Sequence, residues 1–553
     1  MTNISEQPTL RRSRAWSFYF ILCLTVIPVF FSVPLAWCFA FYSIYTAKWM
    51  TYSRAWTILF FISCCEVVFT IYHYRLACHI SDKLPFATGE PTDIRIAFIR
   101  LLKAGLAKIP SDGGELETLL ADQPVNLVSE IPIVQLDRHD PRAIAFRHTL
   151  RTWFCNAPFS SIRRHHVEKW LYWTMYNTAL PPSDQIPADR RSALNEAVDL
   201  LQMRIGCEVP EGSNGDVRPM LLTVDETNIF WRPLTFYVVV AMINCFAMKT
   251  YAVFLDVHRC QSNGIEYLIR TPSNWDSATS PRPIVFLHGL GLGVLQYHSA
   301  IMFLLKHYPD RPILIPLQPQ ASQNIFHPNF LKPFSRHEMA NRLAALLRKL
   351  EWVKVWDEDK ELCRTEACDE LSEEELAGVE VKESLAGSAY LSQRGITMIS
   401  HSNGSYIHAW MLKGHPELIG RSCFIDPVTF CSWEGDVCYD FLYQPCVTGM
   451  ELLIRYFVAT ELGVANLLHR HFCWTSNSLW FEEIPNARDP HKNLFVLGGK
   501  DVIVNAERVK RYLTSHGVRE NLFCDPEGQH GQALIRDSPA LNEILRWLSE
   551  DET

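Results

Sequence analysis

Three short segments in the second half of the chain carry side chains that together could break an acyl bond. Ser402 lies in Ser400-His-Ser-Asn-Gly404, Asp501 ends Gly498-Gly-Lys-Asp501, and His530 ends Asp525-Pro-Glu-Gly-Gln-His530. A serine hydroxyl becomes a strong nucleophile when a histidine removes its proton and a carboxylate orients that histidine. These residue types therefore predict nucleophilic acyl chemistry, provided that the fold brings them together.

Each of these side chains follows a short apolar run that is typical of a β-strand. The runs are residues 395–400, 493–497 and 521–524, and three further runs at 265–270, 283–287 and 422–425 have the same character. Helical patterns alternate with them, which favours a parallel sheet. Because the carboxyl ends of parallel strands lie at one edge of a sheet, we expect the three side chains to meet there.

The surroundings of Ser402 resemble a nucleophile elbow. A strand runs into the serine, and the helical pattern Tyr406-Ile-His-Ala-Trp-Met-Leu412 follows it. Such a turn exposes the hydroxyl and leaves no room for large side chains at the flanking positions. Here the pattern is S-x-S-x-G. Ser400 replaces the usual glycine, and serine is still a small residue. A match of five residues is also compatible with an ordinary strand-to-helix turn. The other motifs of the chain must therefore distinguish such a turn from a nucleophile elbow.

A glycine-rich loop, His288-Gly-Leu-Gly-Leu-Gly293, follows the apolar run 283–287. Such a loop either holds a phosphate or presents backbone N–H groups to a developing oxyanion. Val294 follows Gly293, so the loop lacks the lysine and hydroxyl residue of a P-loop. We therefore favour the oxyanion role.

Taken in order, H-G-L-G-L-G, S-H-S-N-G and G-K-D followed by a histidine 29 residues later resemble the α/β-hydrolase superfamily over about residues 264–553. The resemblance implies an α/β fold: a mostly parallel sheet with helices on both faces and a helical lid. It further implies a triad of Ser402, Asp501 and His530. The backbone N–H groups of Leu290 and Asn403 would form the oxyanion hole, and no cofactor or metal would be required.

Asp426 is an alternative triad acid, because it also follows a strand and because the superfamily can supply its acid from either of two successive strands. Pro427 and a long insertion come directly after it, which favours a structural turn. His401 is expected to be a packed side chain, and His288 a brace for its loop.

Residues 427–485 lie between two predicted strands, where this fold usually carries its lid. The segment is rich in aromatic residues, which could line an apolar tunnel for an acyl chain. We expect about half of them to form the lid's own core instead.

The N-terminal part predicts a membrane anchor. A basic tail at 1–14 precedes residues 15–47, which contain no charge, and a second apolar run covers 55–74. Together they predict a transmembrane hairpin at 15–74, with a shallow re-entrant hairpin as the alternative. Arginine and lysine flank both ends more heavily than the connecting loop, which predicts that both ends face the cytosol.

Residues 75–258 read as mainly helical, and 259–553 as the hydrolase domain. Within the first region, the apolar run 234–248 has 15 residues, which is short for a crossing, so we expect a buried helix or a segment lying in the membrane interface. It would brace the following domain against the bilayer.

Composition excludes some functions. The net charge is −8 and residues 357–383 alone carry twelve acidic against three basic side chains, which predicts an acidic insertion at the surface. The rest of the chain is near neutral, which argues against nucleic-acid binding. Seventeen scattered cysteines without zinc spacing favour reduced thiols and a cytosolic catalytic domain.

The sequence thus predicts a membrane-anchored serine hydrolase of lipid or other hydrophobic esters, at an organelle such as the endoplasmic reticulum or the lipid-droplet surface. Its predicted partners are a lipid bilayer and an acyl-containing small molecule, while protein partners stay unspecified. Two alternatives are an acyltransferase using the same triad and an inactive membrane scaffold built on a hydrolase fold.

Overall fold

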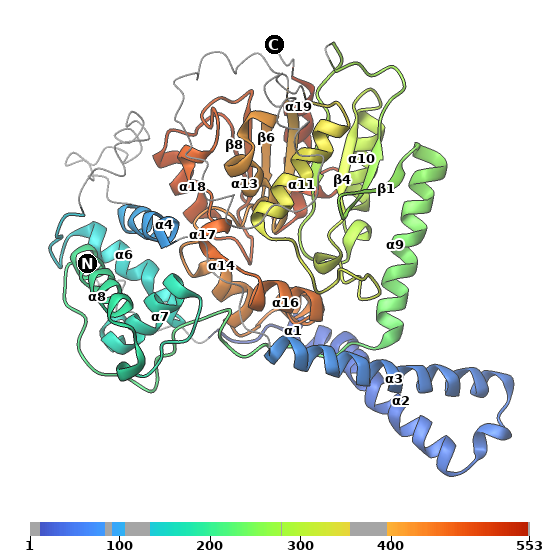
Figure 1. Ribbon diagram of the computed structural model, residues 1–553. Coiled ribbons are helices and arrows are strands. Elements are labelled where there is room, and N and C mark those ends of the chain that lie inside the picture. The colour runs from blue at the N-terminus through green and yellow to red at the C-terminus, as the bar shows by residue number, and fades with distance from the viewer. Residues whose placement is uncertain (1–11, 83–90, 105–132, 278, 354–394, 551–553) are drawn as a thin grey trace, which may run out of the picture.

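A computed structural model of the chain describes residues 12–82, 91–104, 133–277, 279–353 and 395–550. The predicted acidic insertion at 357–383 lies outside these residues. The model places a central sheet beside a group of helices, and two further long helices project from the body (Figure 1).

The sheet has eight strands in the order β1-β2-β4-β3-β5-β6-β7-β8. Strands β3 to β8 pair in parallel, and β1 and β2 join them in antiparallel fashion. The strands are β1 His258–Ser262, β2 Ile265–Arg270, β3 Ile284–Leu287, β4 Ile313–Pro316, β5 Ile396–His401, β6 Ile419–Ile425, β7 Asn493–Gly498 and β8 Leu522–Asp525. An α/β fold with a mostly parallel sheet is therefore confirmed.

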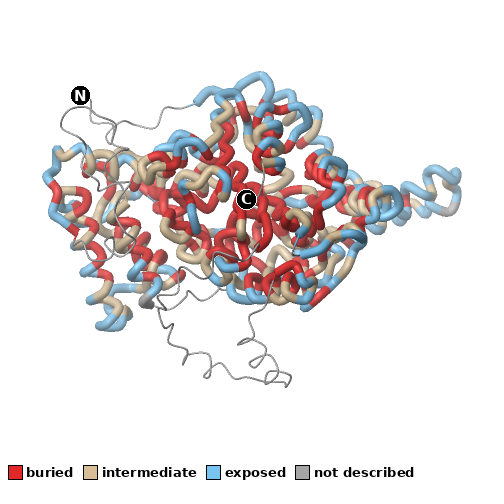
Figure 2. Tube along the Cα trace, turned by 90° about the horizontal axis from the view of Figure 1, so that it is seen from above, coloured by how far each residue is buried: buried red, intermediate tan, exposed pale blue. Residues whose placement is uncertain are grey.

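Side chains alternate between the two faces of the sheet, so each face has its own core. Val285, Phe424 and Phe495 pack on one side, whereas Phe286, Ile425 and Val496 pack on the other. The first face is covered by α11 Arg336–Lys349, α13 Gly404–Gly414 and α18 Ala506–Ser515, and the second by α9 Leu234–Leu255, α10 His298–His307 and α19 Pro539–Ser549. Figure 2 shows that buried residues concentrate in this central body.

The helices before the sheet share the core of the first face. They are α4 Pro91–Lys103, α6 Pro141–Leu150, α7 Arg164–Tyr176 and α8 Ala188–Ile205. Asp140 caps the N-terminus of α6, since its carboxylate accepts a hydrogen bond from Arg142 N–H and Pro141 is the first residue of the helix. Trp170 and Trp173 of α7 are buried in this shared core.

Three helices in the described chain are long and apolar enough to cross a membrane. The first covers residues 16–45 and consists of α1 Trp16–Ile21, a π-helical stretch at Leu22–Val26 and α2 Ile27–Tyr45. The second is α3 Arg54–Asp82, which lies beside α2 (Figure 1). The third is α9, which runs along the body, across the direction of α2 and α3.

The third apolar run lies in a helix that is longer than the run. Helix α9 has 22 residues, because it continues past Lys249 through Thr250-Tyr-Ala-Val-Phe-Leu255. It is also not a buried helix, since six apolar side chains on it are strongly exposed: Val239, Met242, Ile243, Phe246, Val253 and Phe254.

Residues 427–485 form short helices between β6 and β7. These include α14 Asp436–Cys438, α15 Gly449–Ile454, α16 Leu462–Arg470 and α17 Trp474–Asn477. They pack against the helical region before the sheet, where Trp153 Nε1 donates to the Trp433 carbonyl and Trp474 Nε1 to the Thr174 carbonyl.

Candidate active site

Ser402 sits on a strained turn between β5 and α13. Its φ is +52°, a left-handed conformation that is unusual for residues other than glycine. Ser402 N–H donates to the Ile425 carbonyl at 3.1 Å, and Ser405 Oγ donates to the Ser402 carbonyl at 2.6 Å. Gly404 allows the close approach to β3, because a Cβ there would lie 2.3 Å from the Leu287 oxygen. This local geometry is that of a nucleophile elbow.

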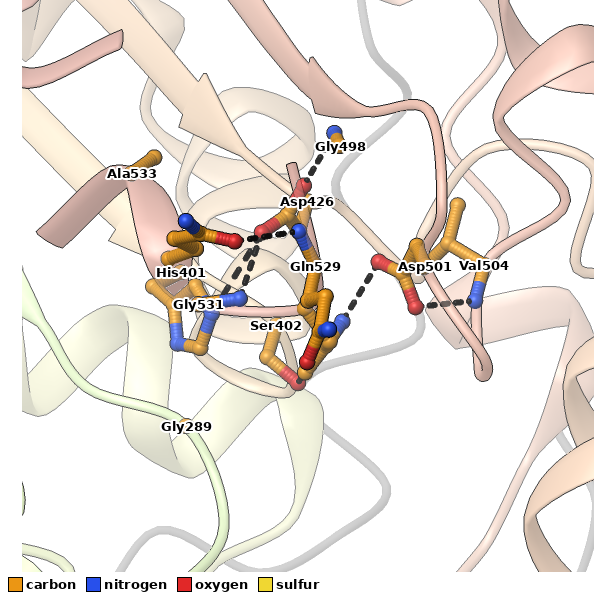
Figure 3. Close-up of polar contacts among 12 residues, drawn as sticks. Gly289, His401, Ser402, Asp426, Gly498, Asp501, Val504, Gln529, Gly531 and Ala533 are labelled. Carbon is orange, nitrogen blue, oxygen red and sulfur yellow. Dashed lines mark hydrogen bonds and ion pairs between the residues drawn. The ribbon is translucent and has the colours of Figure 1, made fainter. Parts of the chain in front are cut away.

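Ser402, His530 and Asp501 form one hydrogen-bonded series. Figure 3 shows Ser402, Asp501 and the neighbouring Asp426 in this site. His530 Nε2 lies 2.9 Å from Ser402 Oγ, and His530 Nδ1 lies 2.6 Å from Asp501 Oδ2. The serine is at the end of β5, the aspartate follows β7, and the histidine follows β8. The three side chains expected to meet at the carboxyl edge of the sheet are thus brought together.

Asp501 is itself held in a fixed orientation. Its Oδ1 accepts from Ile503 N–H at 2.7 Å and from Val504 N–H at 3.0 Å, which leaves Oδ2 for His530. The side chain is 1% exposed. A buried carboxylate with these partners can set the imidazole so that Nδ1 carries the proton and Nε2 faces the serine.

The electrostatics of the site favour a proton on His530. Burial opposes the charged imidazolium, but the charge of Asp501 and its hydrogen bond outweigh burial, and Asp426 adds to them. Together they raise the pKa of His530 to about 9. The histidine is therefore a strong base once it has lost its proton.

Two backbone N–H groups beside Ser402 have no acceptor within the described chain. They belong to Leu290, in the glycine-rich loop after β3, and to Asn403, at the start of α13. The loop approaches the serine closely at Gly289, where a Cβ would lie 2.8 Å from the Cβ of Ser402. Unpartnered donors on either side of a nucleophile can receive an oxyanion.

Tyr297 is a buried side chain of the candidate site that no sequence pattern indicated. Its hydroxyl accepts from Gly289 N–H at 2.9 Å and lies 2.8 Å from His401 Nδ1, so it joins the glycine-rich loop to the elbow. No motif marks this tyrosine, because it enters the site from the turn before α10. His401 is fully packed, as expected, and burial lowers its pKa well below the usual range.

His288 also lies inside the loop rather than at its surface. Its Nδ1 is 2.9 Å from the Gly289 carbonyl, and its own carbonyl accepts from Gln318 Nε2 at 3.1 Å. The side chain is 2% exposed, so it packs within the loop.

Asp426 binds backbone and not the ring nitrogens of His530. Its Oδ1 accepts from Gly498 N–H at 2.8 Å and its Oδ2 from Gly531 N–H at 2.7 Å. It therefore ties the end of β7 to the residue that follows His530. Burial raises the pKa of Asp426 to about 6, although the charge of His530 acts against this.

His401, Asp426 and His530 place their potential ligand atoms within 4.8 Å of one another. Both ring nitrogens of His530 are already hydrogen-bonded, to Ser402 and to Asp501. A cation bound here would have to displace one of these two bonds, so the arrangement fits the triad better than a metal centre.

A cavity of about 40 Å³ adjoins the elbow. It touches Asn403 and continues between α13 and α16. Its lining is largely apolar and includes Tyr406, Ile407, Trp410, Leu467, Leu468 and Phe472. Among the aromatic residues of the 427–485 segment, Phe472 lines this cavity and also belongs to the shared core. The other buried aromatic residues named here belong to the shared core and do not line the cavity: Phe430, Trp433, Trp474, Trp480 and Phe481.

Comparisons with known proteins give structural neighbours only. No family model matches the chain, and no curated protein matches it. Among solved structures, a bacterial membrane phospholipase A described as a virulence factor has 13% identity and a TM-score of 0.32, and covers 56% of this chain and 90% of its own.

Two enzymes of Bacillus subtilis give similar values. Carboxylesterase CesB has 8% identity and a TM-score of 0.31, covering 57% of this chain and all of its own. Naproxen esterase has 13% identity and a TM-score of 0.32, and the match covers 56% of this chain and 97% of the esterase. Likenesses this low carry no argument by themselves. The sheet order, the elbow at Ser402 and the loop after β3 are the grounds on which the fold is an α/β-hydrolase fold.

Proposed function

We propose that this chain is a membrane-anchored serine hydrolase that cleaves hydrophobic carboxylic esters through Ser402, His530 and Asp501. The observation that carries the proposal is the continuous series of hydrogen bonds from Ser402 Oγ through His530 to Asp501, next to two unpartnered backbone N–H groups. A scaffold without activity has no need for this combination, and nucleophilic acyl chemistry requires it.

The proposed reaction has two steps. Ser402 Oγ attacks the ester carbonyl carbon while its proton passes to His530 Nε2, and the N–H groups of Leu290 and Asn403 hold the carbonyl oxygen as its negative charge develops. His530 then donates the proton to the departing alcohol, which leaves an acyl group on Ser402. Water attacks that acyl group while its proton passes to His530; the bond between the acyl carbon and Ser402 Oγ then breaks, His530 returns the proton to Ser402 Oγ, and the carboxylic acid leaves. Asp501 stabilises the imidazolium in both steps.

The proposed substrate class is an ester with an apolar acyl chain. The cavity beside Asn403 supports this proposal, because its lining would bury hydrocarbon next to the attacked carbonyl. The cavity has a volume of about 40 Å³, so it would hold only the part of the acyl chain next to the carbonyl, and the remainder of a long chain would extend beyond it.

The proposed membrane contact involves all three apolar helices. Two contacts support a hairpin whose ends lie on the same side: Ala15 N–H donates to the Val447 carbonyl, and Arg470 Nε donates to the Ile80 carbonyl. Both ends thereby touch the same body. We propose that the body faces the cytosol, as the distribution of basic residues and the reduced cysteines favour.

The third apolar helix, α9, would lie on the membrane surface and not cross it. The residues before α9 and the strands after it share one hydrophobic core. If α9 crossed the bilayer once, these two parts would lie on opposite sides of the membrane and could not form that core. Its exposed stripe of Val239, Met242, Phe246 and Val253 recurs at helical spacing and points away from the body. Such a stripe suits the boundary between headgroups and acyl chains.

Labelling with an alkyl fluorophosphonate tests the proposed enzyme activity. We expect the full-length protein in phosphatidylcholine vesicles to be labelled on Ser402, and Ser402→Ala to lose all labelling. Ser515→Ala is the matched control, because Ser515 ends α18 away from the turn and its hydroxyl donates to the Tyr512 carbonyl of its own helix. Absence of labelling in well-folded wild-type protein would refute the enzyme and favour a scaffold.

A further inference from the structure

Helix α9 has a second face, which points toward the body. Tyr237, Val240, Ala247 and Tyr251 are buried along this face, and Asn244 lies in the same row. At the N-terminus of α9, Leu234 N–H donates to Glu66 of α3 at 2.7 Å, so the helix is joined to the projecting hairpin. One helix thus contacts both the hairpin and the body that carries Ser402.

Asn244 contacts the glycine-rich loop directly. Its Nδ2 donates to the Leu292 carbonyl at 2.8 Å, and its Oδ1 accepts from Leu295 N–H at 2.9 Å. A second N–H of the same amide donates to Val240 within α9 at 2.9 Å. The approach is close, since a Cβ on Gly293 would lie 3.3 Å from Asn244 Oδ1.

This double contact fixes the part of the loop just beyond the proposed oxyanion donor. Leu290 precedes Leu292 by two residues, and on the other side Gly289 is held by Tyr297. Gly291 N–H donates to the Ala321 carbonyl at 2.9 Å, and Leu292 N–H to Gln296 Oε1 at 3.1 Å. Among these loop contacts, only those of Asn244 come from an apolar helix at the edge of the body.

A partly buried amide in a largely apolar helix is costly unless its polar atoms are bonded. Leucine at this position would pack on the loop without that cost, but it could neither donate to Leu292 nor accept from Leu295. The paired contact matches the donor and acceptor of an asparagine side chain, which fixes the loop in one register.

We propose that Asn244 is a positioning residue for the oxyanion hole, holding Leu290 N–H in place from the membrane-facing helix α9. This inference rests on the proposed hydrolase function. Asn244 does not touch the substrate. It acts through the loop Leu292–Leu295, so its effect falls on the transition state, where the oxyanion carries its full charge.

The test compares three variants of the full chain in phosphatidylcholine vesicles. Asn244→Leu removes both loop contacts, and Asn244→Asp keeps the size and the acceptor for Leu295 but loses the donor to Leu292. Tyr251→Phe is the matched control, because it removes a different bond between α9 and the body, from the Tyr251 hydroxyl to His298 Nδ1. Fluorophosphonate titration counts reactive serines, so that kcat for 4-nitrophenyl octanoate is expressed per reactive serine.

We expect Asn244→Leu to lower kcat per reactive serine about tenfold, less than the loss of a whole oxyanion donor, with KM within about twofold of wild type. The inhibition constant of an alkyl trifluoromethyl ketone, which forms a tetrahedral oxyanion on the serine, should rise in parallel. Asn244→Asp should show the same pattern to a smaller degree, and Tyr251→Phe should leave both quantities unchanged.

A merely structural role would reduce the number of reactive serines and leave kcat per serine and the ketone affinity unaltered. The proposal is overturned if Asn244→Leu, or Asn244→Asp where the first variant does not fold, matches Tyr251→Phe in both quantities. Failure of the hydrolase function itself gives a different result, namely wild-type protein without any titratable serine.

Discussion

Two buried carboxylates lie at the ends of neighbouring strands, and they differ in what they bind. Asp501, after β7, directs one oxygen at His530 and the other at two backbone N–H groups. Asp426, after β6, uses both oxygens on the backbone of Gly498 and Gly531. The first arrangement can set the state of an imidazole, and the second can hold a loop in place.

If the proposed ester hydrolysis takes place at this site, its pH dependence follows from the charge of Asp501. Only neutral His530 can accept the serine proton, so kcat/KM should fall as pH drops through the pKa of His530, which is raised to about 9. In Asp501→Asn the carboxylate that stabilises the imidazolium is gone, so burial lowers the pKa of His530 and only the charge of Asp426 still opposes it. We expect the midpoint of the pH profile to move down from its wild-type value, and kcat to fall about 10³–10⁴-fold.

Asp426→Asn is the control for this experiment. Its single carbonyl oxygen can serve only one of Gly498 N–H and Gly531 N–H, so the free energy of unfolding should fall by about 1–3 kcal/mol. The pH midpoint should move less than in Asp501→Asn. A larger shift and a larger loss of kcat in Asp426→Asn would mean that Asp426 is the functional acid.

At the scale of elements, the cavity between α13 and α16 would set the length of acyl chain that the proposed hydrolase accepts. Leu467→Trp should fill this cavity, because Leu467 lies in its wall. We expect kcat/KM for 4-nitrophenyl octanoate to fall about tenfold or more, while the value for the acetate changes by less than about twofold. The measurement is a series of esters of increasing chain length.

Met450→Trp serves as the matched control, since Met450 is in the same 427–485 segment but is 50% exposed and outside the cavity. Equal losses for acetate and octanoate in Leu467→Trp would place the acyl chain elsewhere.

The sequence predicts elements well where apolar runs are continuous and poorly where proline interrupts them. Strand β2 agrees residue for residue with the predicted run, and the runs that lead to Ser402 and Asp501 agree within a residue. Strand β4 was missed because its four residues lie between Pro312 and Leu317 and end in Pro316, and proline in a short run argues against a strand. Backbone pairing of β4 with both β2 and β3 stabilises it as a strand, although its own sequence does not predict one.

The candidate site could be predicted only where side chains follow strands within a motif. Ser402, Asp501 and His530 have such positions. Tyr297 and Asn244 do not, because they reach the loop after β3 from helical segments whose placement depends on tertiary packing. The aromatic residues of 427–485 were ambiguous for the same reason, since the sequence does not reveal that the helices before the sheet would cover them.

At the scale of the whole molecule, the contacts at both ends of the hairpin predict its topology. In sealed microsomes, epitope tags at the N- and C-termini should both be removed by added protease, because both ends of the hairpin touch the same body. A tag inserted in the loop 46–53 should be protected if the hairpin crosses the bilayer.

Protection of one terminus and digestion of the other would contradict a hairpin. A digested 46–53 tag together with digested termini would favour the re-entrant alternative.

The contact between α1 and α15 limits how a soluble form could be made. Gly449 N–H donates to Ser17 Oγ at 3.2 Å, and a Cβ on Gly449 would lie 2.6 Å from the Ser17 carbonyl oxygen, so the two helices touch backbone to backbone. Truncation before α4 would remove α1, which packs against Gly449. It would also remove the carbonyls of Ile80 and Ser81, to which the buried Arg470 guanidinium donates. The apolar helices are thus part of the folded unit, and a water-soluble version is better sought by replacing the exposed residues of α2 and α3 with polar ones than by cutting the chain.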